Sequence, residues 1–168
     1  MKKERKIMIA WVLFFICFLV GTCFSAFGAG YEGLEGLKTV KAVFDVRIAN
    51  PKSAAFMIKL IHQTYKDGNI AAITDKPDFV VVFVGPSVKL ISKDRGGFSP
   101  EESKMLDEIA GTISEMSKDG IKFEICLVAA RVLGLDPASV LPEIKQVDNG
   151  FISLIGWQTN GYSLVPVY

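Results

Sequence analysis

Residues 79–84 read Phe79-Val80-Val81-Val82-Phe83-Val84, an unbroken apolar run rich in β-branched side chains. A strand that is apolar on both faces is typical of the centre of a parallel sheet that is covered by helices on both sides. The run continues directly into Gly85-Pro86-Ser87, a stretch that ends regular strand structure. These residues therefore predict a buried central strand followed by a turn.

The chain before this strand has the patterns of a strand and a helix, and the chain after it has the pattern of a second helix. Residues 40–48 alternate between apolar and polar side chains and predict a first strand. Asn50-Pro51 has the form of a helix N-cap followed by proline, and it predicts a helix to about residue 66. Ser99-Pro100-Glu101-Glu102 has the spacing of a capping box and predicts a helix over residues 100–118.

The last third of the chain repeats this alternation. Residues 121–125 predict a third strand, which runs into a helix over residues 127–133 that Gly134 closes. A brief strand over residues 144–147 precedes Asn149-Gly150, and helical spacing then extends from Phe151 to Gln158. Residues 163–167 predict a last strand at a sheet edge, because Pro166 cannot donate to the ladder.

Five strands that alternate with helices predict an α/β fold with a doubly wound, mostly parallel five-stranded sheet and helices on both faces. In such sheets, ligands and reactive groups gather beyond the carboxyl ends of the strands. Three candidates follow strands in this chain: Asn50, the Gly85-Pro86-Ser87 turn and Cys126.

Cys126 is the main candidate for a reactive group. A thiol at a strand-to-helix turn faces unpaired backbone N–H groups and the positive end of the helix dipole, and both favour the thiolate. It is also the only cysteine beyond residue 23, so no second cysteine of the folded part can pair with it. The alternative is that Cys126 is a small buried apolar residue, which is a common environment for a single cysteine.

The N-terminus has the pattern of a targeting segment. Four basic side chains lie within residues 2–6, and residues 7–31 carry no charge. Residues 1–29 therefore predict a signal peptide or an N-terminal membrane anchor, with a cleavage position after Gly28. A lipoprotein site at Cys23 fits poorly, because Thr22 precedes it. Residues 30–37 are then a linker and residues 38–168 a domain in the periplasm or at the extracytoplasmic face, attached to the membrane only through the N-terminal segment.

Composition excludes several classes of function. The chain has 19 basic and 18 acidic residues; removing the four basic and one acidic residues of the first 28 leaves 15 and 17. A slightly acidic domain argues against a nucleic-acid partner. Cys17 and Cys23 belong to the targeting segment, so we expect no disulfide framework. No nucleotide-binding motif is found in the sequence.

The remaining candidates favour structural interpretations. The sole histidine, His62, is twelve residues after Asn50, or about 18 Å along a helix, so it is expected on the helix surface near the opposite sheet edge. A Cys–His dyad and a zinc site are therefore not expected. A cluster of basic side chains either makes the mouth of the site positive or belongs to a solvated loop. Its members are Lys89, Lys93 and Arg95.

Three stretches together resemble the DsrE/DsrF-like sulfur-relay family. They are Val82-Phe83-Val84-Gly85-Pro86-Ser87-Val88-Lys89-Leu90-Ile91, then Gly120-Ile121-Lys122-Phe123-Glu124-Ile125-Cys126, then Val147-Asp148-Asn149-Gly150-Phe151 through Gln158 to Gly161-Tyr162. The resemblance implies flavodoxin-like layering, a persulfide-carrying cysteine at Cys126, and assembly as a trimer or hexamer.

The resulting hypothesis is an exported, sulfurtransferase-like sulfur carrier. Cys126 holds sulfane sulfur as a persulfide, and Gly85, Pro86 and Ser87 are the candidate binding residues. The expected partners are further copies of the chain and a sulfur donor or acceptor, either a protein or polysulfide. This chemistry needs no metal and no organic cofactor. The alternative is a non-catalytic oligomeric binding or assembly module in which Cys126 is structural.

Overall fold

The computed structural model describes residues 30–168 of the chain. The predictions for residues 1–29, a signal peptide or anchor and the poor lipoprotein site at Cys23, lie outside the described residues. Within the predicted linker, η1 (Glu32–Leu34) forms a single 3-10 turn. No helix in the described part of the chain is both long enough and apolar enough to cross a membrane.

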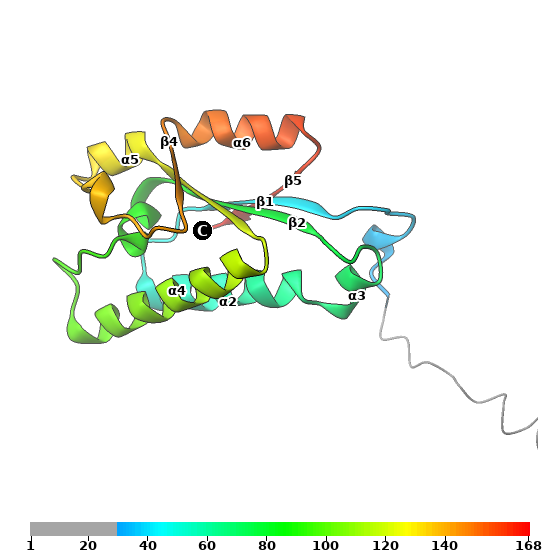
Figure 1. The fold of residues 1–168 in the computed structure, drawn as a ribbon, viewed down its shortest axis with the longest axis horizontal. Helices are drawn as coiled ribbons and strands as arrows, with labels where there is room; N and C mark the ends of the chain where they lie inside the picture. The colour runs from blue at the N-terminus through cyan, green and yellow to red at the C-terminus, as the bar shows by residue number, and fades with distance from the viewer. Residues whose placement is uncertain (1–29) are drawn as a thin grey trace, which may run out of the picture. The chain divides into compact units, whose positions relative to one another are not determined.

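A five-stranded sheet organises residues 36–168 (Figure 1), and all of its strand pairs are parallel. The strand order is β4-β3-β2-β1-β5, so the apolar β2 lies at the centre and the proline-containing β5 at an edge. The predicted α/β fold with a parallel sheet is confirmed. The strands are β1 (Lys41–Val46), β2 (Asp78–Phe83), β3 (Lys122–Cys126), β4 (Lys145–Val147) and β5 (Ser163–Val167).

Helices cover both faces of the sheet, as predicted. Figure 1 shows α2 and α4 on one face and α6 on the other. The helical elements are α2 (Pro51–Tyr65), α3 (Gly68–Ala71), η2 (Gly85–Ile91), α4 (Pro100–Lys118), α5 (Leu127–Val132), η3 (Pro137–Ser139) and α6 (Gly150–Thr159). The crossover from β2 runs through α4, while the crossover from β4 runs through α6, so the two leave the sheet toward opposite faces.

Local capping chemistry begins these helices where the sequence predicts. The Asn50 side chain accepts a hydrogen bond from the backbone N–H of Ser53 at the start of α2. Ser99 and Glu102 form the reciprocal capping box of α4. Each of these caps satisfies backbone N–H groups that the first turn of a helix leaves without intrahelical partners.

Three elements differ from the sequence prediction. The first strand is shorter than residues 40–48, and all of its residues after Lys41 are buried, including Asp45. It is buried because it lies between β2 and β5 and under helices on both sides. After α2, residues 68–71 form one further helical turn, α3, which the Asp67 side chain caps. The turn predicted after β2 is a 3-10 helix, which extends from Gly85 to Ile91.

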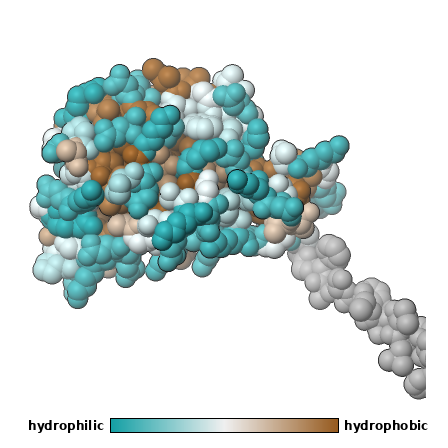
Figure 2. Space-filling view, viewed as in Figure 1, coloured by the Kyte–Doolittle hydropathy of each residue, from teal (hydrophilic) through white to brown (hydrophobic). Residues whose placement is uncertain are grey.

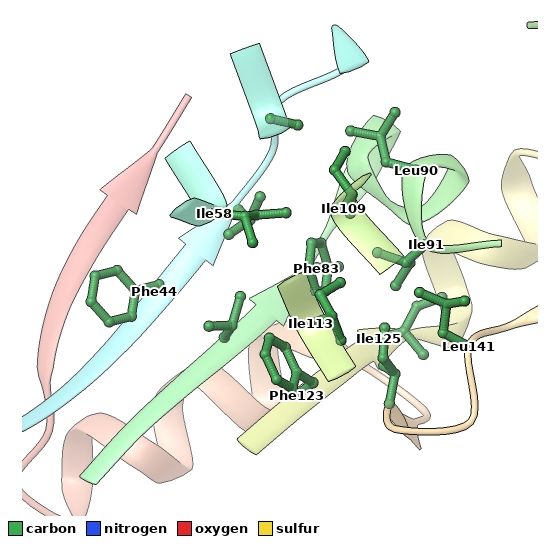
Figure 3. Packing of buried hydrophobic residues seen from close by; sticks show 14 of the residues in the cluster. Phe44, Ile58, Phe83, Leu90, Ile91, Ile109, Ile113, Phe123, Ile125 and Leu141 are labelled. Carbon is green, nitrogen blue, oxygen red and sulfur yellow. The ribbon is translucent and has the colours of Figure 1, made fainter. Parts of the chain in front are cut away.

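The face under α2 and α4 holds the larger apolar cluster. Figure 3 shows Phe83 and Phe123 of the sheet packed against Ile113 of α4. The rings of Phe83 and Phe123 stack at 6.5 Å between centroids, and Phe83 has no exposed surface. Burial of such side chains is the main favourable term in the free energy of folding.

The opposite face holds a smaller apolar cluster under α6. Its members are Val43, Val80, Val82, Val84, Cys126, Leu154 and Tyr162. The outer side of α6 is also apolar, and Phe151, Ile152 and Ile155 are each more than half exposed. Apolar residues accordingly reach the molecular surface along α6, at the top of the space-filling view (Figure 2).

Candidate functional site

Cys126 is the last residue of β3 and the N-cap residue of α5. Its thiol is unpaired and only 4% of the residue is exposed. The side chain belongs to the small cluster under α6 and also lines a cavity of about 350 Å³. Cys126 therefore lies at the floor of a cavity, at the carboxyl edge of the sheet where the sequence predicts a site.

Four strand ends contribute to this cavity. Arg47 follows β1, Val84 to Pro86 follow β2, Cys126 ends β3, and Asn149 follows β4. Apart from Arg47 and Asn149, the walls are almost entirely apolar. The lining residues from the helices are Val128, Ala129, Val132 and Leu133 around α5, and Phe151 of α6. An apolar cavity with a few polar groups is the usual form of a small-molecule site.

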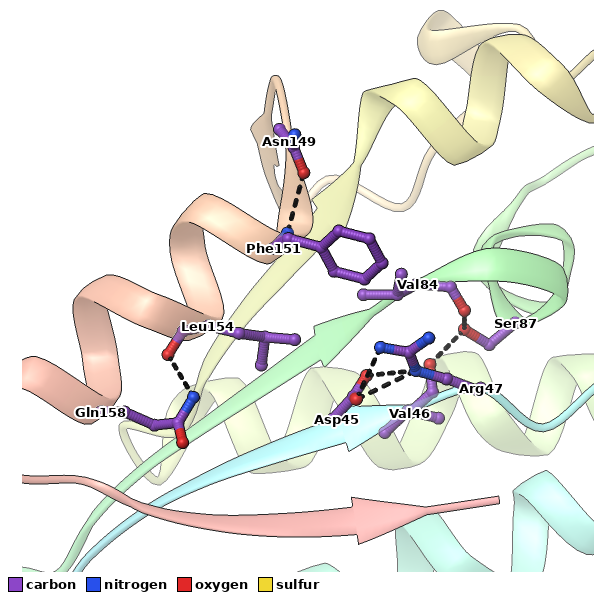
Figure 4. A network of polar contacts seen from close by, with 9 residues as sticks. All are labelled: Asp45, Val46, Arg47, Val84, Ser87, Asn149, Phe151, Leu154 and Gln158. Atoms are coloured by element: carbon purple, nitrogen blue, oxygen red, sulfur yellow. Dashed lines mark hydrogen bonds and ion pairs between the residues drawn. The ribbon is translucent and has the colours of Figure 1, made fainter.

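The three residues of the Gly85-Pro86-Ser87 turn have different environments in the structure. Gly85 and Pro86 line the cavity with Cys126. Gly85 has a φ of 63°, a left-handed conformation that favours glycine. Ser87 does not line the cavity: it is fully buried, and its hydroxyl donates to the backbone carbonyls of Val46 and Val84 at 2.7 and 3.0 Å. Ser87 thus ties the ends of β1 and β2 together (Figure 4).

Gly150 packs directly against Cys126, although its sequence context indicates only a turn before a helix. A Cβ atom at residue 150 would lie 2.9 Å from Cβ of Cys126 and 3.0 Å from Cγ2 of Val84. Only glycine lets the first turn of α6 approach Cys126 this closely. The sequence carries no signal for this contact, because it joins residues of different elements.

Arg47 is a second residue of the site that the sequence patterns do not predict. Its Nε donates to both carboxylate oxygens of Asp45 at 3.0 Å, and Nη2 lies 2.9 Å from Oδ2 of Asp45. The hydrogen bond with Asp45 is the largest cause of a raised pKa at Arg47. The guanidinium lies 5.2 Å from the centroid of the Phe151 ring (Figure 4). The available signal is the two-residue spacing of Asp45 and Arg47, which places both on one side of an extended chain.

The other basic candidates lie away from Cys126. Lys89, Lys93 and Arg95 do not line its cavity. Arg95 instead forms an ion pair of 2.8 Å with Asp107 of α4. These side chains therefore fit the loop interpretation rather than a positive mouth of the site.

His62 lies in the last turn of α2 beside Asp119, which precedes β3, whereas Cys126 ends that strand. Its Nε2 is 2.6 Å from Oδ2 of Asp119, at the end of α4, and this hydrogen bond is the largest cause of a lowered pKa at Asp119. The His62 side chain is only 12% exposed, so it packs between α2 and α4 rather than extending from the helix surface. Within residues 30–168, no group of three or more His, Cys, Asp or Glu side chains is placed to hold a metal ion.

A second, more polar cavity of about 360 Å³ lies beside the first and shares Asn149 with it. Its floor includes Glu124, which is 5% exposed and lies two residues before Cys126 on the same side of β3. Its carboxylate accepts hydrogen bonds from the Ser153 hydroxyl and from Nε1 of Trp157, both on α6. Glu124 therefore anchors α6 to the sheet. Trp157 packs edge-on against Tyr162, with 4.7 Å between the two ring centroids.

The fold and the site together define an α/β protein with a single cysteine at the carboxyl edge of a parallel five-stranded sheet. The chain belongs to the DsrE/DsrF-like family, whose model matches residues 41–167. Membership of this family supports a function of the sulfur-relay type. No curated protein matches the sequence.

The solved structures that are similar to this chain include the following two. A protein of unknown function from Methanobacterium thermoautotrophicum, MTH1491, has a TM-score of 0.57 and 20% sequence identity, covering 76% of this chain and 98% of its own. The ychN protein from E. coli has a TM-score of 0.49 and 13% identity, covering 77% of this chain and 100% of its own. The first similarity supports the fold described above.

Proposed function

We propose that this protein carries sulfane sulfur as a persulfide on Cys126. The observation that supports this most is the position of the thiol, which borders a cavity built from the carboxyl ends of four strands. Family membership supports the same class of chemistry. The cavity offers space next to Sγ in which a second sulfur atom can be held away from bulk water.

The transfer is a thiol exchange reaction. The Cys126 thiolate attacks the outer sulfur of a persulfide or polysulfide, a new S–S bond forms, and the S–S bond of the donor breaks. The leaving sulfur departs with the electron pair as a thiolate or a shorter polysulfide. The reverse step passes the sulfur to an acceptor thiol, so the cycle needs no metal and no organic cofactor.

The test is incubation of the folded protein with polysulfide, followed by mass spectrometry. We expect a mass increase of one sulfur atom on the peptide that contains Cys126, and its loss in Cys126→Ser. Peptide mapping separates this peptide from those of Cys17 and Cys23. An unmodified Cys126 in protein that remains folded would contradict the carrier function.

The second candidate is a non-catalytic binding or assembly module with a structural Cys126. The observation that favours it is the 4% exposure of Cys126, which resembles that of a core residue. Labelling with a small thiol reagent near neutral pH separates the two functions. Fast labelling of Cys126 in the folded protein supports the carrier, and labelling that requires denaturant supports the module.

We further propose that the protein forms a homo-oligomer, a trimer or hexamer. The exposed apolar side chains of α6, Phe151, Ile152 and Ile155, support this, because surplus apolar surface is usually covered by a partner. Light scattering provides the test. A monomer at micromolar concentration would contradict the proposal.

The remaining proposal concerns location. The basic N-terminus and the uncharged run over residues 7–31 support export to the periplasm or the extracytoplasmic face. Protease added to spheroplasts should degrade the protein while cytoplasmic markers survive. Protection until the cells are lysed would contradict export.

A further inference from the structure

Arg47 is the one charged side chain that lines the Cys126 cavity among the described residues. It is held firmly: the carboxylate of Asp45, whose side chain is 5% exposed, accepts from Nε and lies within 2.9 Å of Nη2. The Phe151 ring covers the guanidinium from α6 at 5.2 Å. A guanidinium fixed by a buried carboxylate and an aromatic ring is positioned for directional recognition.

Part of this guanidinium remains available to a ligand. The Arg47 side chain is 37% exposed, and no hydrogen bond joins Nη1 to any residue of the described chain. Because Asp45 balances the charge of Arg47, attraction at long range is weak. Recognition of an anion here depends on a charge-assisted hydrogen bond at short range, which is strong and directional.

The rest of the cavity is suited to a hydrocarbon body. Apart from Arg47 and Asn149 its lining is apolar, and its volume of about 350 Å³ exceeds what one sulfur atom requires. Bare hydrosulfide and polysulfide anions gain nothing from apolar walls, because desolvation of a charge against such walls is unfavourable. An organic molecule gains from burial in the same walls.

We infer that the small molecule that exchanges sulfur with Cys126 is an organic persulfide with an apolar body and an anionic group, and that Nη1 of Arg47 donates to that group. This inference rests on the proposed sulfur-carrier function and names its substrate class. Arg47 acts as a substrate-binding residue. The apolar side chains that contact the hydrocarbon body are Val128, Ala129, Val132 and Leu133.

The step balances with this donor alone. The Cys126 thiolate attacks the terminal sulfur of R–S–S–H, the new Sγ–S bond forms, and the S–S bond of the donor breaks. The electron pair leaves with R–S⁻, and the transferred sulfur keeps its proton. Cys126 is oxidised from the thiol to the persulfide, and the donor is reduced from the persulfide to the thiol.

Binding is tested first, with ligands that cannot transfer sulfur. Calorimetric titration of the full chain compares 4-(methylthio)benzoate with its neutral amide. We expect the carboxylate to bind about tenfold more tightly, since the distinguishing hydrogen bond is charge-assisted. Arg47→Gln should abolish this preference, and Arg95→Gln, which removes an arginine outside the cavity, should keep it. Equal binding of the two ligands by the wild type, or a preference retained in Arg47→Gln, overturns the inference.

Arg47→Gln leaves the buried Asp45 without its cation and can disturb folding. The double variant Asp45→Asn/Arg47→Gln removes both charges and is titrated alongside. We expect it to show no preference between the carboxylate and the amide. A tenfold preference retained in this folded double variant contradicts the assignment of Arg47.

Sulfur transfer is tested second, with three donors: an aryl hydropersulfide that carries a carboxylate, its neutral amide, and inorganic polysulfide. Fastest loading of Cys126 from the carboxylate donor supports the inference. Loading that is fastest from inorganic polysulfide overturns the substrate class and leaves the carrier function intact. No loading from any donor overturns the carrier function, and the titration above then decides alone whether the cavity takes an organic anion.

Discussion

The two faces of the sheet differ in what they bury. The face under α2 and α4 contains a continuous apolar cluster, and no buried carboxylate of the described residues lies on it. The face under α6 buries two carboxylates, Asp45 and Glu124, which flank Val82 in the strand register, and it also holds Cys126 beside a cavity. One face has two long helices as cover, and the other has the ten-residue α6.

The two faces of the sheet therefore have different roles: one mainly stabilises the fold, and the other contains the candidate site. Dry apolar contacts on the α2/α4 face supply the free energy of folding. The α6 face includes buried polar groups and a cavity, features that cost stability and allow binding. Substitutions on the two faces should therefore have different consequences, and the following predictions test this from the largest effect to the smallest.

Phe83→Ala should lower the free energy of unfolding by about 3–5 kcal/mol, because it leaves a cavity in the apolar cluster under α2 and α4. Phe151→Ala, which truncates a ring that is 53% exposed on the other face, should cost far less and should increase labelling of Cys126. Urea unfolding measures both variants. Similar destabilisation by the two substitutions would remove the distinction between the faces.

Gly150→Ala should destabilise the protein by about 1–3 kcal/mol, because the new Cβ overlaps with Cys126 and Val84. Gly156→Ala is the matched control on the same helix: nothing lies within 4 Å of its added Cβ. That variant should be stabilised by about 0.5–1 kcal/mol. Thermal unfolding of both variants should shift in opposite directions, and a shift in the same direction would contradict the close-packing role of Gly150.

Glu124→Ala should cost about 1–2 kcal/mol, since the Ser153 hydroxyl and the Trp157 indole lose their shared acceptor. Glu124→Gln keeps a carbonyl oxygen at the same place and should cost clearly less. Hydrogen exchange of α6 amides provides a local readout, with faster exchange expected in the alanine variant. If the two variants behave alike, Glu124 does not anchor α6.

Tyr162→Phe should cost about 1 kcal/mol at neutral pH, because the phenol donates to Asp78 at 2.6 Å. Burial, together with Asp78, raises the pKa of Tyr162 to about 12. A group whose pKa is higher in the folded state contributes stability below its unfolded pKa, near 10, and loses that contribution as the pH rises through the folded value. The stability difference between wild type and Tyr162→Phe should therefore shrink from pH 10 to 12. A constant difference across this range would contradict the assignment.

Much of the fold follows from local sequence. The apolar run of β2 marks the centre of a parallel sheet because a strand that is covered on both faces has no need of polar positions. The caps at Asn50 and Ser99 place helix starts correctly, because a cap is formed by residues within one turn. Cys126 could likewise be placed at the carboxyl edge, since the order of elements determines which strand ends meet there.

The composition of the site depends on tertiary contacts instead. Arg47, Gly150 and Phe151 meet around Cys126 only because β1, β3 and α6 converge after folding. The inward hydroxyl of Ser87 depends on the Val46 carbonyl, 41 residues earlier in the chain. Local patterns report the neighbours of a residue within about one turn, whereas the wall of a cavity is set by distances between segments that are far apart in sequence. The strands, the central place of β2 and the edge place of β5 could therefore be predicted from the sequence. The arginine that shares a cavity with Cys126 and the glycine packed against this cysteine were decided by the tertiary packing.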